Sequence, residues 1–272
     1  MDNNDIKLLH SLCTFIYIKN PDTGGCVYFA GHNSIVHDRF CAIKCHASVG
    51  QYSYIFQLDL SKNYINLSSL SQCGQNSFGS HIIYHVYGEK TLISTNNTNT
   101  RCRGYNGYHF VTNQAKISFC YFISNDSHET SPYFIIHEYT PDSFVKNSIF
   151  KNNSVKTDET YIGLLYFKGT VTVIPISECI FSHNNANNTF TADYDSTIKV
   201  INCFGDMLTV MCTNKGKSDT DKMETNSFDI TFTHFSCDVK IPILFKQSLF
   251  VRKKKTKGRV NLNFEFSSLF FS

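Results

Sequence analysis

A short phrase recurs along this chain and constrains its fold more than any other feature. The phrase is Cys or Ser, an apolar or aromatic residue, Phe, two free positions and then Asn. Its three clear copies are Cys120–Asn125, Ser148–Asn153 and Cys179–Asn184. Their phenylalanines lie 28 and 31 residues apart (150 − 122 and 181 − 150). Self-similarity at such a period indicates a stack of repeated structural units.

Each copy predicts one strand and one corner of a parallel β-solenoid. Alternate residues of a strand share a face, so Cys120 and Phe122 point inward while Tyr121 points outward. When coils stack about 4.8 Å apart, each inward Phe lies on the next one. Asn tolerates left-handed backbone angles, so we expect Asn125 and its equivalents to form the corner that ends the strand. Stacked asparagines can also hydrogen-bond between layers.

Weaker copies of the phrase extend the array. Cys13–Phe15 lacks the Asn, Cys41–Ile43 has Ile in place of Phe, and Cys203 is followed directly by Phe204. Between the clear copies lie β-rich runs that we assign to the other sides of each coil. At about 25 to 30 residues per coil, the whole chain predicts roughly eight to ten coils.

The composition fits a single elongated all-β domain. Of 272 residues, 42% are hydrophobic and 17% charged, which is enough to bury a substantial core. We assign the repeats to residues 1–212, with the clearest part at 117–205. A polar loop or insertion follows at 213–226. Candidate terminal strands occupy 227–251, and a basic and then Phe-rich tail occupies 252–272.

These motifs resemble the repeats of chlamydial-type polymorphic outer-membrane proteins and of related protist surface proteins. That family carries a Gly-Gly-x-aliphatic tetrad, which Gly24–Val27 fits, and Phe-x-x-Asn, which the three clear copies match. The resemblance covers residues 11–30 and 117–205 clearly and 50–110 loosely. It implies a pectin-lyase-like, right-handed parallel β-helix at a cell surface, often with adhesive roles. The chain departs from the family in having one clear Gly-Gly tetrad.

Charge and hydropathy exclude some partners. The formal charge of +3 is near neutral and predicts no general affinity for nucleic acid. No run approaches 18 consecutive apolar residues, so we expect no transmembrane segment. The acidic start Met1–Asp5 is not a secretory signal, although the resemblance suggests a cell-surface or extracellular location. Because Cys13–Phe15 already resembles a coil without a cap, we favour a fragment of a longer product. Oligomeric state is left open.

The cysteines allow two interpretations. Eleven is an odd number, so disulfides cannot pair all of them within one chain. Cys13, Cys120 and Cys179 fall at the inward position of the phrase, where a free thiol packs as a small apolar group. We favour buried packing thiols there over disulfides, although export would favour pairing.

Candidate chemistry is sparse, and we assign no catalytic, cofactor-binding or metal-binding residue. Asp193 and Asp195 could place two carboxylates on one strand face, but we favour a polar turn there. Cys41, Cys45 and His46, joined by Cys26, Cys73 or Cys102, could suggest zinc. Structural zinc sites usually show two closely spaced ligand pairs, and only one irregular pair is present. His37 and Asp38 lack any nucleophile in an identifiable context.

Three functional hypotheses follow. The first is a non-enzymatic, adhesin-like protein that presents an extended face to a glycan or to a host or other protein surface, with no cofactor. The second is a carbohydrate-active enzyme, a polysaccharide lyase or hydrolase, on the same fold. The third is a truncated product without independent function. The first two differ in whether acidic residues gather along one side of the rod.

Overall fold

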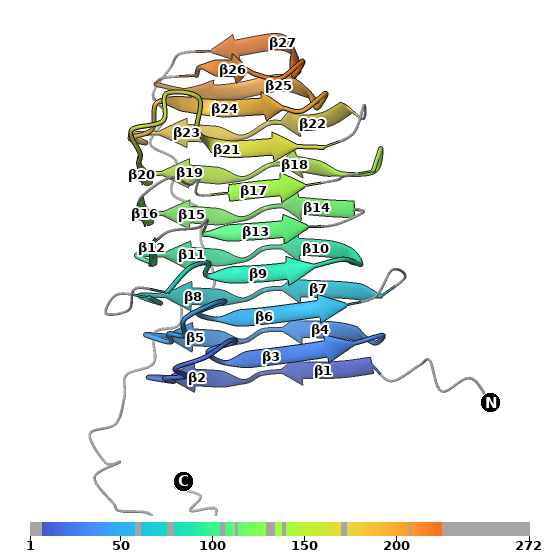
Figure 1. Cartoon of the computed structure of the whole chain (residues 1–272), viewed down its shortest axis with the longest axis vertical. Helices are drawn as coiled ribbons and strands as arrows, with labels where there is room; N and C mark the ends of the chain where they lie inside the picture. Colours follow the sequence, from blue (N-terminus) through green and yellow to red (C-terminus); the bar gives the residue numbers. More distant parts are fainter. Residues whose placement is uncertain are drawn as a thin grey trace, which may run out of the picture. The chain divides into compact units, whose positions relative to one another are not determined.

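Parallel strands make up the regular structure of this chain, seen here in a computed structural model (Figure 1). The structure describes residues 7–57, 61–74, 79–103, 107–111, 114–128, 134–137, 140–169, 173–206 and 208–224. These residues contain no helix, and their strands stack into one elongated β-solenoid of about seven turns. They belong to one compact unit, Met1–Cys237. The prediction of an all-β, parallel β-helical domain is confirmed.

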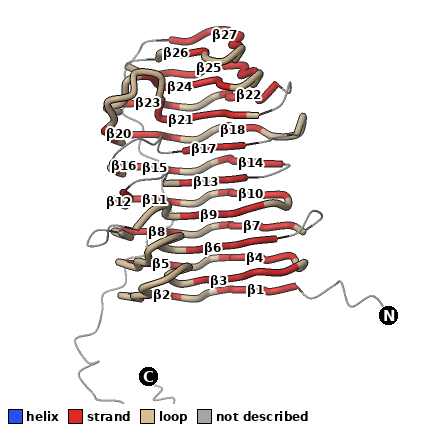
Figure 2. The backbone as a smooth tube through the Cα atoms, viewed as in Figure 1, coloured by secondary structure: helices blue, strands red, loops and turns tan. Residues whose placement is uncertain are grey.

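Three long faces and one short face run along the solenoid, and the strands of each face pair in parallel (Figure 2). We call one full turn a coil. The first face contains β1 (Lys7–Ser11), β4 (Ser34–Asp38), β7 (Lys62–Asn66), β10 (Glu89–Ile93), β14 (Gln114–Ser118), β18 (Phe144–Lys146), β22 (Val173–Ser177), β25 (Thr197–Gly205) and β27 (Lys217–Glu224). The second contains β2 (Thr14–Ile16), β5 (Cys41–Ile43), β8 (Ser69–Ser71), β11 (Asn96–Thr98), β15 (Tyr121–Ile123), β19 (Ile149–Lys151) and β23 (Ile180–Ser182).

The long strand β25 pairs with both β22 and β23, so the first two faces join into a 16-stranded sheet. The third face contains β3 (Val27–Gly31), β6 (Ser53–Gln57), β9 (Ile83–Val86), β13 (Tyr108–Val111), β17 (Phe134–His137), β21 (Gly163–Lys168), β24 (Asn188–Asp193) and β26 (Val210–Cys212). A short face follows the second one in three coils: β12 (Arg101–Arg103), β16 (Asp126–His128) and β20 (Ser154–Lys156).

The recurring phrase forms the inner ladder that it predicted. Phe122, Phe150 and Phe181 lie in register on β15, β19 and β23 and are buried. Their rings stack at centroid distances of 4.8 and 4.9 Å with interplanar angles of 12° and 5°. Cys120 and Cys179 are buried free thiols two residues earlier, as the packing interpretation expected. Stacking therefore follows directly from repeating one residue type at one register.

The corner after the phrase differs from the prediction by one residue. The left-handed conformation lies at Ser124, Asn152 and His183, with φ of 54°, 54° and 53°, and not at the asparagines that follow. This bend turns the next side chain inward. Asn125 Nδ2 donates to Asn153 Oδ1 at 2.9 Å, and Asn153 Nδ2 donates to Asn184 Oδ1 at 3.0 Å. The asparagine ladder is confirmed, but it lies in the interior, where each amide is satisfied by its neighbours.

The C-terminal predictions are only partly covered by the described residues. The stretch 213–226, predicted as a polar loop or insertion, contains β27, which pairs with β25. The predictions for 227–251 and 252–272 lie outside the described residues. The described part has about seven turns, against the eight to ten coils predicted for the whole chain. No helix within the described ranges is long and apolar enough to cross a membrane.

Candidate functional site

A row of outward side chains follows the corner between the second and third faces. We call Tyr17, Lys44, Gln72, Asn99 and Ser124 the corner row; one lies directly after each of β2, β5, β8, β11 and β15. All five have left-handed backbone angles, with φ between 52° and 55°. Their strands pair in register, so the five corners lie in one line. The row spans four strand spacings, or about 19 Å.

The local sequence does not favour this backbone. Outside Gly, Asn and Asp, a left-handed residue costs roughly 1–2 kcal/mol, and Tyr17, Lys44 and Gln72 are not among the favoured types. The stacked backbone compensates, because each corner N–H donates to the next coil. Tyr17 N reaches Ile43 O at 3.0 Å, and Lys44 N reaches Ser71 O at 2.9 Å. The register of the solenoid therefore fixes the corner row.

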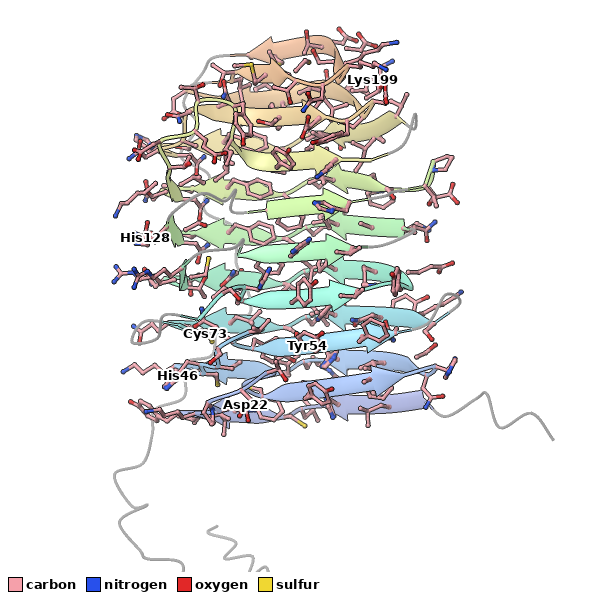
Figure 3. All side chains as sticks on the ribbon, viewed as in Figure 1. Asp22, His46, Tyr54, Cys73, His128 and Lys199 are labelled. Atoms are coloured by element: carbon pink, nitrogen blue, oxygen red, sulfur yellow. The ribbon has the colours of Figure 1, made fainter. Side chains whose placement is uncertain are left out.

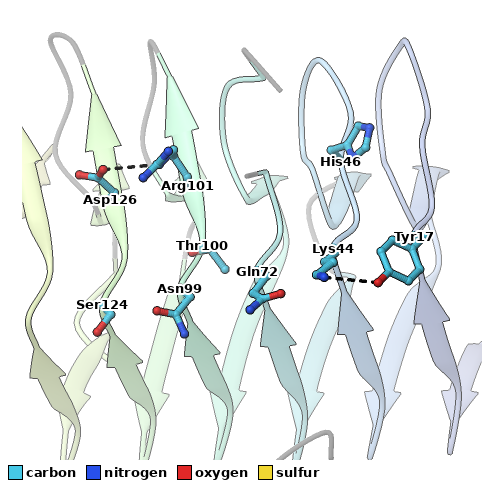
Figure 4. A pocket seen from close by; sticks show the side chains of 9 residues that line it. All are labelled: Tyr17, Lys44, His46, Gln72, Asn99, Thr100, Arg101, Ser124 and Asp126. Atoms are coloured by element: carbon cyan, nitrogen blue, oxygen red, sulfur yellow. Dashed lines mark hydrogen bonds and ion pairs between the residues drawn. The ribbon is translucent and has the colours of Figure 1, made fainter. Parts of the chain in front are cut away.

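The corner row forms part of a groove at the edge of the solenoid (Figure 4). Thr100, Arg101, Asp126 and His46 line it as well, and its volume is about 680 Å³. That volume lies within the usual range of ligand sites, roughly 300–1,000 Å³. Figure 4 shows the corner row along successive strand ends, with Arg101 and Asp126 from the short face beside it. Hydroxyl, amide and charged groups dominate this lining.

A cluster of basic groups surrounds Asp126 at one end of the groove. Asp126 Oδ2 lies 3.5 Å from Arg101 Nε, 2.8 Å from His128 Nε2 and 3.5 Å from Lys156 Nζ. Strand pairing brings these groups together from β12, β16 and β20. We call Arg101, His128 and Lys156 the basic cluster. Figure 3 shows His128 at the same edge of the solenoid as the groove residue His46.

At the other end of the groove, a lysine lies on a tyrosine. Lys44 Nζ is 3.3 Å from Tyr17 OH and 5.2 Å from the centroid of its ring. A cation held near an aromatic ring is ordered without being neutralised, so its charge still faces the groove. Gln72 lies between this pair and the coil of β11, where Asn99 accompanies Arg101 of the basic cluster. The groove thus has a cationic group near each end and amides in the middle.

The acidic pair considered in the sequence forms a turn. Asp193 ends β24 and is buried, whereas Tyr194 and Asp195 have left-handed φ of 47° and 57°. The Asp193 carboxylate accepts hydrogen bonds from Tyr166 OH and, at 2.8 Å each, from Thr213 and Asn214. Burial alone raises the pKa of Asp193, but these hydrogen bonds lower it below its ordinary value overall. This arrangement supports the polar-turn interpretation.

The residues considered for zinc lie in separate places, and one of them, Cys41, is disulfide-bonded. Cys26, Cys45 and Cys73 lie inside the early coils, where hydrogen bonds from Cys26 and Cys73 lower the pKa of the Cys45 thiol below its ordinary value. His46 instead lines the outer groove, and Cys102 contacts Ser127 Oγ at 3.6 Å. Among the described residues, no three or more His, Cys, Asp or Glu side chains are arranged to hold a metal ion.

The pair His37 and Asp38 is likewise divided between inside and outside. His37 is buried with Nδ1 3.1 Å from Tyr52 OH, whereas Asp38 pairs with Arg39 at 2.8 Å on the surface. Neighbours along a strand point to opposite faces, which explains the separation. The two side chains therefore share no site.

Sequence reasoning missed the corner row because it looked for Asn at the corner. Only Asn99 belongs to a residue type that favours left-handed backbone. The sequence nevertheless contains a signal. Each corner residue comes two positions after the residue that occupies the inward phenylalanine position of its coil. Tyr17 follows Phe15 and Ser124 follows Phe122 in this way, and the register carries the same offset through the coils between them.

No protein family, no curated protein and no solved structure matches this chain. The comparisons therefore give no support to the resemblance to polymorphic outer-membrane or pectin-lyase-like proteins. What is established is a parallel β-solenoid, and its function has to be argued from the groove itself.

Proposed function

We propose that this chain is a non-enzymatic, adhesin-like binding protein that holds an extended glycan in its corner groove. The observation that carries the proposal is the corner row. Five outward side chains, one per coil, lie in line within a groove of about 680 Å³. A linear polymer placed along the solenoid axis meets a new set of donors and acceptors at every coil.

The lining chemistry favours a glycan over a protein partner. Protein interfaces usually centre on buried aromatic or apolar anchors surrounded by a polar rim. Among the described lining residues, Tyr17 is the one Phe, Tyr or Trp side chain, and it lies at an end. The middle presents the amides of Gln72 and Asn99, and Ser124 adds a hydroxyl in the next coil. Such groups match the hydroxyls of a sugar polymer.

The carbohydrate-active enzyme receives less support from the same groove. Glycosidases generally use two carboxylates placed across the bond that they cleave. Asp126 is the one carboxylate among the described lining residues, and its Oδ2 is held by three basic groups. A carboxylate held in this way suits the fixing of cations in place better than attack or proton transfer.

A glycan array probed with the whole purified chain tests the proposal. The informative variant is the double substitution Gln72→Gly with Asn99→Gly, because glycine keeps the left-handed corner while it removes both amides. We expect about tenfold weaker binding of the best glycan, since each side chain supplies one or two hydrogen bonds.

The matched control is Leu67→Gly. Leu67 is an exposed left-handed corner residue, with φ of 45°, at the other corner that flanks the second face. We expect it to bind the glycan as the unmodified chain does. Failure of the array to detect any glycan, or equal binding by the double variant and the unmodified chain, contradicts the proposal.

A further inference from the structure

We propose that the glycan held in the corner groove is acidic, and that its carboxylate or sulfate groups bind Arg101 and Lys44. This inference rests on the proposed function and specifies its ligand. Both cations line the groove, and each is held in place by a neighbour. The proposal follows from how the charges are arranged, in depth and along the groove.

The burial of each charged side chain determines whether a ligand that approaches the groove meets positive or negative charge. The side chain of Asp126 is 16% exposed, whereas those of Arg101 and Lys156 are 49% and 56% exposed. The carboxylate therefore lies beneath the cations that neutralise it. Arg101 and Lys156 are two cations beside one carboxylate, so the cluster retains net positive charge at its outer surface. An approaching anion is attracted and an approaching cation is repelled.

Asp126 also orients the guanidinium of Arg101. The contact uses Nε at 3.5 Å and leaves the two terminal nitrogens of the fork for a ligand. Those nitrogens form paired hydrogen bonds with the two oxygens of a carboxylate or sulfate, which is the strongest geometry available to arginine. Asp126 is thus a positioning residue for Arg101.

The distance between Lys44 and Arg101 predicts the spacing of the acidic groups along the polymer. Lys44 follows β5, while Arg101 belongs to the coil of β11, two coils further along the axis. Two strand spacings amount to about 10 Å. The coil between them contributes the neutral amide of Gln72, and Asn99 adds a second amide in the coil of Arg101. We therefore expect acidic groups about 10 Å apart along the glycan, separated by neutral, hydroxyl-bearing units.

The test compares polymers that differ only in charge. The probes are polygalacturonate and hyaluronan, each paired with its carboxyl-reduced form, and chondroitin sulfate, paired with a form that is both desulfated and carboxyl-reduced. Binding is measured by titration calorimetry on the whole chain. We expect at least one acidic polymer to bind tenfold or more tightly than its neutral partner at low salt. This preference should shrink as salt screens the charges.

Two single variants then locate the interaction. Arg101→Gln and Lys44→Gln should each weaken binding of the acidic polymer tenfold or more, because each variant loses a hydrogen bond between two charged groups. Binding of the neutral partner should stay unchanged. The control Lys199→Gln removes a cation that pairs with Asp219 on the first face, away from the groove. It should leave both affinities unchanged.

The outcomes separate the two proposals. Equal binding of acidic and neutral partners overturns the inference and leaves the proposed function intact. If none of these polymers and no glycan on the array binds, both are overturned. An acidic preference that survives the Arg101 and Lys44 variants, or that Lys199→Gln weakens equally, also overturns the inference. Thermal unfolding of each variant shows whether its fold is retained.

Discussion

The two halves of the solenoid have the same backbone register, but different side chains occupy its inward positions. Between residues 114 and 205, the inner register of the second face holds the phenylalanine stack, and the following corner holds the asparagine ladder. Between residues 34 and 111 the same positions vary. Strand pairing assigns Ala42, Leu70 and Asn97 to the phenylalanine register, and Cys45, Cys73 and Thr100 to the asparagine register.

The interior of the N-terminal half is also polar. His85 is buried, with its ring nitrogens 2.8 Å from Ser53 Oγ and 2.9 Å from Asn63 Nδ2. Lys90 is buried nearby and donates to Gly88 O at 3.0 Å. In the described part of 114–205, Asp193 is the one buried side chain that carries a carboxylate, imidazole or amine.

This difference shows that uniform ladders are not required to build a coil. Strand pairing and corner geometry continue through both halves, so the backbone sets the fold and the side chains adjust its stability. Buried polar groups contribute less than apolar ones even when they are hydrogen-bonded. We therefore expect the C-terminal half to be the more stable part of the domain and the N-terminal half to respond to pH.

The largest effect is expected from a charge placed in the phenylalanine stack. Phe150 is fully buried between the rings of Phe122 and Phe181, so Phe150→Asp buries an unpaired carboxylate. We expect a loss of several kcal/mol in the free energy of unfolding, enough to abolish the cooperative transition. Urea unfolding followed by circular dichroism measures this loss.

Phe119→Asp is the matched control. Phe119 precedes the same motif in the neighbouring coil, but it is 53% exposed and has a left-handed φ of 55°, which Asp tolerates. Its unfolding midpoint should change little. A normal transition in Phe150→Asp would show that the stack is not the stable centre of this half.

The next largest effect is expected from acid, and it should be larger in the N-terminal half. Burial lowers the pKa of His37 to about 3, of His81 to about 4 and of His109 to about 2. It also lowers the pKa of His85 well below its ordinary value. All four histidines lie between residues 34 and 111, whereas in the described part of the C-terminal half burial lowers the pKa of one histidine, His137, to about 4.

These lowered pKa values determine how the stability of the fold changes with pH. Because the folded pKa values lie below the ordinary 6.5, the unfolded chain takes up protons first, and stability falls as the pH drops below about 6.5. Each buried histidine costs up to about 2 kcal/mol at pH 5. Hydrogen exchange at pH 7 and pH 5, corrected for intrinsic rates, should show protection lost in residues 79–103 before residues 173–205. Uniform loss along the chain would contradict the comparison.

The sequence predicted the uniform half well and the groove poorly, for physical reasons. Phe122, Phe150 and Phe181 repeat one residue type at one register, so the ladder is visible in the sequence. The corner row is not, because the stacked backbone imposes left-handed angles on whatever residue lies there, including Tyr17 and Lys44. The basic cluster required knowledge of which coils are neighbours, which the period of the motif gives only roughly.

The smallest of the three effects is expected from the buried amine of the N-terminal half. Burial lowers the pKa of Lys90 from its ordinary 10.5 to about 7. The unfolded chain therefore keeps a proton that the folded chain gives up between pH 7 and 10.5, and the wild type gains stability as the pH rises through that window. Lys90→Met removes this cost, which is at most on the order of 4 kcal/mol at pH 7.

The comparison with Lys62→Met isolates the buried amine. Lys62 lies in register on the neighbouring strand next to Glu89 and is half exposed, so its replacement should change stability little. Urea unfolding at pH 7, 8.5 and 10 should show Lys90→Met more stable than the wild type at pH 7, with the difference falling to less than about 1 kcal/mol by pH 10. Lys90 also lowers the pKa of His85, so Lys90→Met should reduce acid sensitivity as well. Lys90→Met could instead be less stable than the wild type at every pH. In that case the packing and hydrogen bonding of the amine outweigh the free-energy cost of burying it. The N-terminal half, with its polar interior, would then not be the less stable half.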